Sequence, residues 1–141
     1  MAHKINPTSF RISVNKDWKS RWFGGKKYQD FLKEDVAVRK FLTKKLKNMS
    51  VDRIDIEKSP DVLSILIHTA RPGLIIGIGG NGVEELHDFM VKKLSSLYRD
   101  KGLLERIKKI NIDIAVEEIK KTDVSGPVIA QNIAWDLEKR I

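Results

Sequence analysis

A glycine-rich stretch near the middle of the chain is the part of the sequence best suited to contact phosphate. Residues 77–82 read GIGGNG, and glycines leave no side chain between a loop and a phosphate-bearing ligand. Gly77, Gly79 and Gly82 have the G-x-G-x-x-G spacing of dinucleotide-binding loops. Gly77 and Gly80 also have the G-x-x-G spacing of a loop that lies against a nucleic acid backbone. The first pattern predicts an enzyme, and the second predicts a nucleic-acid binder.

The residues on either side of the glycines favour the second pattern. A dinucleotide loop must directly follow a buried strand, precede a helix and have an acidic residue about 20 positions later. Asp100 lies 18 residues after Gly82, so an acidic residue is available. However, Pro72 and Gly73 leave only three apolar residues before Gly77, which is too short for the required strand. We therefore interpret the dinucleotide spacing as a coincidence.

Apolar periodicity predicts the elements that position these glycines. We expect a helix over 33–48, an antiparallel hairpin of strands 51–57 and 62–69, a short helix over 72–76, a helix from Asn81, a strand over 107–116 and a final helix from Gly126. The second strand is apolar on both faces, so we expect it at the centre of the sheet. A short helix, a G-x-x-G turn and a longer helix, packed on a three-stranded sheet, make an RNA-binding KH module. The predicted fold class is therefore α+β.

The sequence also predicts two details of the helices. Asn81, with Glu84 three residues later, fits a capping box that binds free N–H groups of the first helical turn. In the final helix, Ile129, Ile133 and Leu137 have the spacing of an inward-facing apolar stripe.

Positive charge is concentrated in the first third of the chain. The sequence holds 27 Lys and Arg against 19 Asp and Glu, a net charge of +8. Residues 1–50 contain 13 basic and 4 acidic residues, whereas residues 51–141 contain 14 and 15. A basic surface that served only solubility would not need this segregation. The distribution predicts a basic arm that binds a polyanion, attached to a nearly neutral domain.

The first 29 residues combine basic and aromatic side chains with little periodicity. Basic residues contact phosphates, and aromatic rings stack on exposed bases, so this composition favours RNA binding. Trp18 and Trp22, four residues apart, are equally suited to pin the arm to the folded domain.

The sequence contains no evident catalytic or metal-binding group. It has no cysteine, which excludes disulfides and thiolate metal sites. His3, His68 and His87 are isolated from one another and match no ligand motif. No apolar run approaches the roughly 20 residues of a membrane span, and the N-terminus lacks the apolar core of a signal sequence. We expect no enzymatic activity, no cofactor, no metal and no membrane partner.

Four segments follow one another along the chain: HKINPTSFR, DWKSRWF, VRKFLTKKL and IHTARPGLIIGIGGNGVEEL. Together they resemble the bacterial-type family of small ribosomal subunit protein S-three, from near Met1 to about Arg140. The segment from Thr69 to Gly80 is the most specific part. The resemblance implies a type II KH domain at residues 33–118, preceded by a basic N-terminal arm at 1–32. Residues 119–141 would then be a linker and the first helix of a further α/β domain.

The resemblance also implies a function. The protein is expected to be a structural component of the small ribosomal subunit, located on the cytoplasmic ribosome and bound to ribosomal RNA in the subunit head. Messenger RNA near its entry channel and neighbouring head proteins are the other expected partners. The alternative is a free-standing KH protein that acts on messenger or small RNA. The expected RNA-binding residues are His3, Lys4, Asn6, Pro7, Arg11, Lys16, Lys19, Arg21, Trp22, Lys26, Lys27, Lys40, Lys44, Arg71, Gly77, Ile78, Gly79 and Gly80.

The sequence departs from the family pattern in three places. The arm of the family commonly reads K-x-H-P-x-G-x-R, but Asn6 and Ser9 replace the histidine and the glycine here. The variable positions of the G-x-x-G loop are often basic, but here they are Ile78 and Gly79. Of the further domain only the opening helix, 127–140, is expected, which leaves its apolar stripe without a cover. We therefore expect the arm, rather than the loop, to supply most of the RNA affinity.

Overall fold

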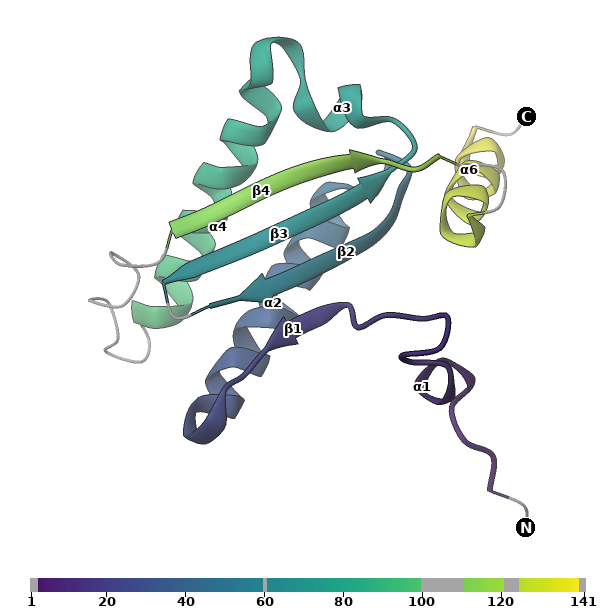
Figure 1. Cartoon of the computed structure of the whole chain (residues 1–141). Helices are drawn as coiled ribbons and strands as arrows, with labels where there is room; N and C mark the ends of the chain where they lie inside the picture. The colour runs from purple at the N-terminus through teal and green to yellow at the C-terminus, as the bar shows by residue number, and fades with distance from the viewer. Residues whose placement is uncertain (1–2, 60, 100–110, 121–124, 140–141) are drawn as a thin grey trace.

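The computed structural model describes residues 3–59, 61–99, 111–120 and 125–139. Four strands form one mixed sheet in the order β1-β2-β3-β4 (Figure 1). They are β1 Ser20–Trp22, β2 Val51–Lys58, β3 Val62–Thr69 and β4 Asn111–Glu118. β2 and β3 pair antiparallel, while β1 pairs with β2 and β4 pairs with β3 in parallel. The predicted hairpin and the central position of β3 are confirmed.

The sheet contains one strand more than the three that the sequence predicts. The additional strand, β1, comes from the arm and aligns Ser20 with Ile56 on β2. The Ile56 N–H donates to the Lys19 carbonyl oxygen at 3.0 Å. A three-residue strand is too short to show an alternating apolar pattern, so only its pairing with β2 reveals it.

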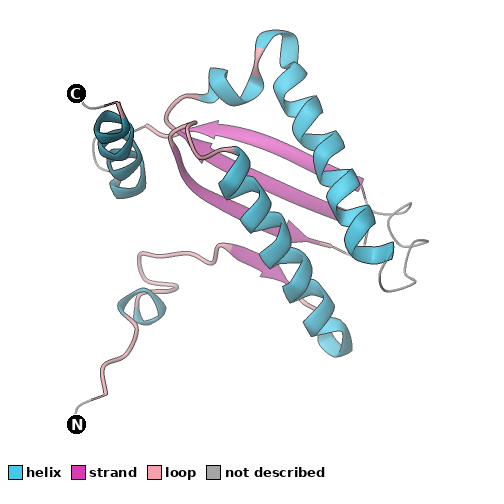
Figure 2. Ribbon diagram, turned by 180° about the vertical axis from the view of Figure 1, so that it is seen from behind, coloured by secondary structure: helices cyan, strands magenta, loops and turns pink. Residues whose placement is uncertain are grey.

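Helices cover one face of this sheet (Figure 2). They are α2 Tyr28–Lys45, α3 Pro72–Ile76 and α4 Asn81–Arg99. The core between helices and sheet consists of aliphatic side chains whose spacing is 3.6 on the helices and two on the strands. Its most buried members are Val38, Leu42, Leu46, Ile56, Leu63, Ile65, Ile67, Ile75, Leu86, Met90 and Leu94. The opposite face of the sheet carries no helix of this group, so Ser64 and Leu66 of β3 are only half-buried.

Several element bounds differ from those predicted. α2 begins at Tyr28, five residues earlier than expected, because the short 3₁₀ helix η1 Gly25–Lys27 runs directly into it. It ends at Lys45, with Leu46 as its C-cap. β4 extends to Glu118, and residues 107–110 of the predicted strand lie outside the described residues. The short helix α3 has the predicted bounds, with Pro72 in its first turn.

The capping box predicted at Asn81 is wrong. Asn81 has helical backbone angles, φ −55° and ψ −32°, so it is the first residue of α4 and not the cap that precedes it. The short 3₁₀ helix η2 Ile78–Gly80 leads directly into α4. Asn81 therefore continues the helical backbone instead of preceding it.

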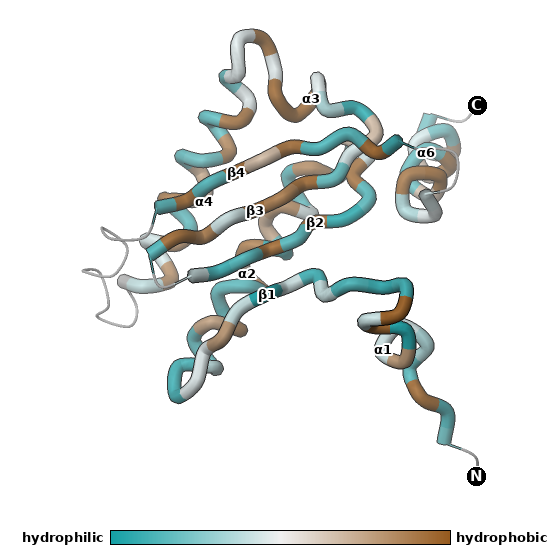
Figure 3. Tube along the Cα trace, viewed as in Figure 1, coloured by the Kyte–Doolittle hydropathy of each residue, from teal (hydrophilic) through white to brown (hydrophobic). Residues whose placement is uncertain are grey.

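The last described helix, α6 Gly126–Glu138, packs on the end of β2. Ser125 caps it by accepting from the Val128 N–H at 3.4 Å, and its hydroxyl donates to Asp52 at 2.5 Å. The predicted inward stripe is wrong, because Ile133 and Leu137 are 54% and 71% exposed. Val128 alone is fully buried among the described residues of this helix. Figure 3 shows α6, which carries both hydrophobic and hydrophilic residues, standing apart from the helices that cover the sheet.

Candidate nucleic-acid interface

The part of the predicted arm that precedes α2, residues 3–27, presents an almost uniformly basic surface and is called the arm from here on. It carries seven lysine and arginine residues and a single aspartate, Asp17. All seven side chains are exposed: Lys4, Arg11, Lys16, Lys19, Arg21, Lys26 and Lys27. His3, Asn6 and Pro7, also expected to contact RNA, are exposed on the same segment. The arm runs along the β1 edge of the sheet and then away from the domain (Figure 1).

A short helix, α1 Pro7–Phe10, shapes the first part of the arm. The Asn6 side chain caps it by accepting from the Thr8 and Ser9 amides at 2.9 and 3.3 Å. Arg11 donates from Nη1 to the Pro7 carbonyl oxygen at 2.8 Å. Asn6 therefore has a local structural task, which is to hold the turn that places Arg11.

Arg39 on α2 fixes the second part of the arm to the domain. Its guanidinium donates to the carbonyl oxygens of Ile54 at 2.6 Å and Lys19 at 3.0 Å. It also donates to the Ser20 hydroxyl at 2.9 Å and contacts Asp35 at 3.3 Å. One side chain thus joins α2, β2 and the arm. The sequence shows Arg39 only as one of many basic helix residues, so its role was missed.

Trp22 is a second attachment of the arm. Its Nε1–H donates to Asp35 at 3.2 Å, and its ring packs against Tyr28 and Phe31, with centroids 5.3 and 5.8 Å away. Of the two roles considered for the tryptophans, the structure places Trp22 in the anchoring one. Trp18, in contrast, is 60% exposed beside the arm's basic residues.

Arg21 on β1 lies in an ion-pair network with two carboxylates. It pairs with Asp17 and, at 2.9 Å, with Glu57 on β2. The Trp18 amide, which donates to Asp17 at 2.8 Å, and the Arg21 charge lower the pKa of the Asp17 carboxyl below its ordinary 3.8. Asp17 in turn raises the pKa of Arg21. Any phosphate that binds Arg21 must compete with these carboxylates.

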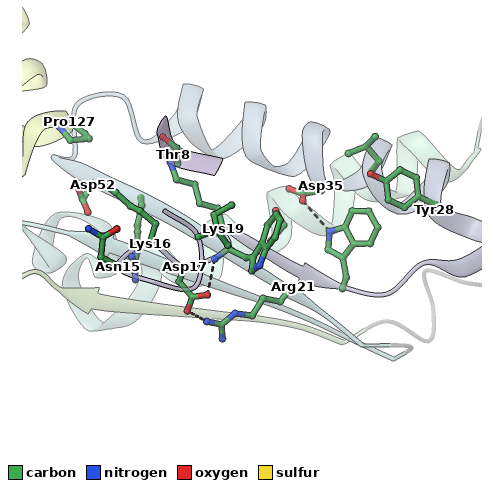
Figure 4. A pocket seen from close by; sticks show the side chains of 16 residues that line it. Thr8, Asn15, Lys16, Asp17, Lys19, Arg21, Tyr28, Asp35, Asp52 and Pro127 are labelled. Carbon is green, nitrogen blue, oxygen red and sulfur yellow. Dashed lines mark hydrogen bonds and ion pairs between the residues drawn. The ribbon is translucent and has the colours of Figure 1, made fainter. Parts of the chain in front are cut away.

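A wide recess lies between the arm and the domain (Figure 4). Its volume is about 980 Å³. Lys16, Lys19 and Arg21 line it from the arm, and Asp35 and Asp52 line it from α2 and β2. Asp17 of the arm and Arg53 of β2 line it as well, so the wall formed by the arm is mainly basic and the wall formed by the domain carries charges of both signs. Of these two walls, the one formed by the arm attracts phosphate.

The outer surface of α2 adds further positive charge. Lys40 and Lys44, both expected to contact RNA, are exposed there. Lys45 is exposed on the same helix, with its Nζ atom 4.6 Å from the centroid of the Phe89 ring on α4. The lysine spacing predicted this surface, but the aromatic contact depends on the packing of α2 against α4.

The glycine loop connects α3 to α4 without charged residues of its own. Gly77, Gly79 and Gly80 have φ values of 70°, 66° and 88°, which residues other than glycine rarely adopt. Ile78 at the tip is 94% exposed. Arg71, the nearest basic residue expected to contact RNA, is exposed where α3 begins. Because a helix and not a strand leads into the glycines, the structure lacks the strand that a dinucleotide loop requires.

The described part of the chain offers little other site chemistry. No group of three or more histidine, aspartate or glutamate side chains within it is arranged to hold a metal ion. No helix among the described residues is long and apolar enough to cross a membrane. The His68 Nε2 atom lies 3.1 Å from the Asp55 Oδ2 atom, a contact between neighbouring strands β3 and β2.

Comparison with known proteins supports the arrangement described above. A family profile described as KH domain matches residues 37–123, more than half of the sequence. The chain therefore belongs to the KH domain family. The predicted α+β class and type II KH fold are confirmed.

Curated relatives match along all 141 residues. Proteins named small ribosomal subunit protein uS3 from Lactobacillus gasseri and Lactobacillus acidophilus are 42% and 43% identical to it. The protein of that name from Exiguobacterium sibiricum is 38% identical. The chain spans 57–59% of the length of these three relatives. The resemblance found in the sequence is thereby confirmed.

Proposed function

We propose that this protein is a structural component of the small ribosomal subunit and binds ribosomal RNA without catalysing a reaction. The observation that carries the proposal is the basic arm, whose exposed side chains are held on the domain by Arg39 and Trp22. The names of its relatives and its KH fold support the same conclusion. An attached basic arm presents its charges to RNA with less loss of conformational freedom than a free tail.

The finer location follows from the family resemblance. We propose a place in the head of the subunit near the entry channel for messenger RNA, beside neighbouring head proteins, on the cytoplasmic ribosome. We also propose the division into an arm at 1–32, a KH domain at 33–118 and a linker with a helix at 119–141. The alternative, a free-standing KH protein acting on messenger or small RNA, would use the same surfaces.

The arm and the exposed lysines of α2 are proposed to supply most of the RNA affinity. Lys4, Arg11, Lys26 and Lys27 have no ion pair among the described residues and are therefore ready to contact phosphates. The glycine loop with Ile78 and Gly79 allows close approach to a backbone but adds no charge. RNA affinity should consequently fall steeply as salt rises.

The test compares variants of the arm with a variant of the loop. Replacing Lys4, Arg11, Lys26 and Lys27 by alanine should weaken binding to small-subunit RNA far more than Gly79→Asp. As a control of equal charge, Lys92, Lys93, Lys120 and Lys139, all exposed, are replaced by alanine. Filter binding at several salt concentrations should show a slope smaller by about 0.7–0.9 for each phosphate that the arm variant no longer neutralises. A more damaging loop variant would contradict the proposal.

Co-sedimentation separates the ribosomal protein from a free KH factor. Protein expressed in cells should sediment with small subunits and remain bound at moderate salt. If most of it stays in the soluble fraction, the alternative function is favoured.

A further inference from the structure

Phe89 presents an exposed aromatic ring where α4 lies beside α2 in the helical layer (Figure 2). The residue is 44% exposed, whereas Leu86 and Met90 on the same helix are buried. Phe41 on α2 covers only part of the ring, with the two ring centroids 6.3 Å apart and the planes inclined by 37°. The exposed part of the Phe89 ring is therefore available to a further planar group.

Two lysine ammonium groups lie beside this single ring. The Nζ atoms of Lys45 on α2 and Lys92 on α4 are 4.6 and 5.9 Å from the Phe89 centroid. Both lysines are exposed, and neither forms an ion pair with a described residue. Their like charges repel each other, so a bound anion would stabilise the arrangement. The ring and the two lysines together suit a ligand that is both planar and anionic.

The charges around the ring favour the same kind of ligand. Lys44 and Lys93, which adjoin the two lysines in the sequence, are also exposed, and α2 has no acidic residue after Asp35. On α4, Asp88 faces β4, where it lines a groove to which Phe89 does not contribute. Glu85 alone is an exposed carboxylate one helical turn before the ring among the described residues. Positive charge therefore predominates on the α2 side of the ring.

We propose that Phe89, Lys45 and Lys92 bind one unpaired nucleotide of RNA, which rests on the proposed function and extends it to a second surface. The base stacks on the exposed part of the Phe89 ring. The phosphates on either side of that nucleotide contact Lys45 and Lys92. Such stacking tolerates any base, because every base has a π face. No residue of the arm contributes to the site, so it is distinct from the arm.

The test compares two RNA probes that are about eight nucleotides long. One is oligoadenosine, and the other has the same sugars and phosphates but no bases. In the full chain carrying the arm variant, Phe89→Leu should weaken oligoadenosine binding at least about fivefold, whereas Phe89→Tyr should stay within about twofold. The abasic probe cannot stack and should bind all three proteins equally. In the unaltered protein, oligoadenosine should shift the Phe89 ring resonances, and the abasic probe should not.

Removing the two charges tests the phosphate contacts. Lys45→Gln with Lys92→Gln should weaken binding of both probes and reduce the salt slope by about 0.7 for each phosphate released. Lys120→Gln with Lys139→Gln removes the same charge from exposed positions outside α2 and α4 and should change little. The charge control for the arm also lacks Lys92 and should lose that one contact, far fewer than the arm variant loses.

Two results would overturn the proposal. One is equal oligoadenosine affinity with and without Phe89→Leu, or Phe89 resonances that oligoadenosine leaves unshifted in the unaltered protein. The other is a peptide alternating leucine with glutamate that shifts these resonances at lower concentration than oligoadenosine does, which would indicate an acidic protein partner. Failure of the proposed function is a separate result, because it would leave the arm variant binding small-subunit RNA as tightly as the parent does.

Discussion

Arg39 on α2 and Lys19 in the arm are twenty positions apart in the sequence. The Arg39 guanidinium donates a hydrogen bond to the Lys19 carbonyl oxygen at 3.0 Å. The same guanidinium satisfies the Ile54 carbonyl oxygen on β2 at 2.6 Å. The basic arm is therefore positioned from within the KH domain by one partly exposed side chain.

Arg39→Met should destabilise the protein and release the arm. The substitution keeps an apolar stem but removes charged hydrogen bonds, so the free energy of unfolding should fall by about 1.5–3 kcal/mol. Urea denaturation measures this change, and faster amide exchange at Ile56 would report release of the arm. Lys40→Met, at the next and exposed position, is the control and should have little effect. Equal stability of the two variants would contradict the role given to Arg39.

The buried ion pair between Glu34 and Lys58 should show strong coupling. The two side chains are only 9% and 5% exposed, and the Lys58 Nζ lies 4.0 Å from the Phe31 ring centroid. Lys58→Met leaves a buried carboxylate and should cost about 3–5 kcal/mol, whereas adding Glu34→Leu should recover much of that loss. A double-mutant cycle in denaturant measures the coupling energy. Additive effects of the two substitutions would show that the pair is not coupled.

Gly82 and Gly73 should respond differently to alanine. A Cβ at Gly82 would lie 2.3 Å from the Ile75 carbonyl oxygen, because α3 and the start of α4 approach closely there. At Gly73 a Cβ would meet no atom within 4 Å. Gly82→Ala should therefore lower the unfolding free energy by about 1–3 kcal/mol, whereas Gly73→Ala should leave it unchanged or raise it by up to about 1 kcal/mol. Thermal and denaturant unfolding of the two variants measure these changes. Equal unfolding free energies of Gly82→Ala and Gly73→Ala would contradict the prediction.

The Asp17 carboxyl should titrate below its ordinary pKa of 3.8 in the folded protein. Its folded pKa is lowered, so its contribution to stability is present above the unfolded pKa and is lost as the pH falls through the folded value. Arg21→Ala should raise the pKa of Asp17 only in part, because the larger cause, the Trp18 amide, remains. Carboxyl chemical shifts followed by NMR between neutral and acidic pH measure both effects. A pKa that returns fully to 3.8 in the variant would contradict this order of causes.

Asp17→Asn should strengthen RNA binding. The substitution removes the arm's single negative charge and one of the two carboxylates that pair with Arg21. A phosphate that binds Arg21 then has less competition from carboxylates. We expect tighter binding and a steeper dependence on salt, measured by filter binding. Asp61→Asn, which removes an exposed charge outside the arm, is the control. Weaker RNA binding of Asp17→Asn would show that the ion pair orders the arm for RNA.

Local patterns were enough to predict most of the fold. β3 and α3 have the expected bounds because a short apolar run and a proline in the first helical turn are features of adjacent residues. The same holds for the basic arm, since charge is counted directly along the chain. The residues on either side of the loop glycines predict a KH turn without reference to packing.

The anchoring of the arm could not be predicted in this way. β1 exists because residues 20–22 find the edge of β2, and Trp22 is placed by α2 rather than by its neighbours. The outward direction of Leu137 likewise depends on how α6 meets β2.

The sequence by itself determined the α+β class, the order of the KH elements and the concentration of positive charge in the first third. The tertiary structure alone decided which of these charges remain free. Arg39 is engaged by carbonyl oxygens, Arg21 is paired with carboxylates, and Lys4 is left exposed. The physical reason is that periodicity and charge are properties of neighbouring residues, whereas hydrogen bonds and ion pairs join residues far apart in the chain, such as Arg21 and Glu57, which are 36 positions apart.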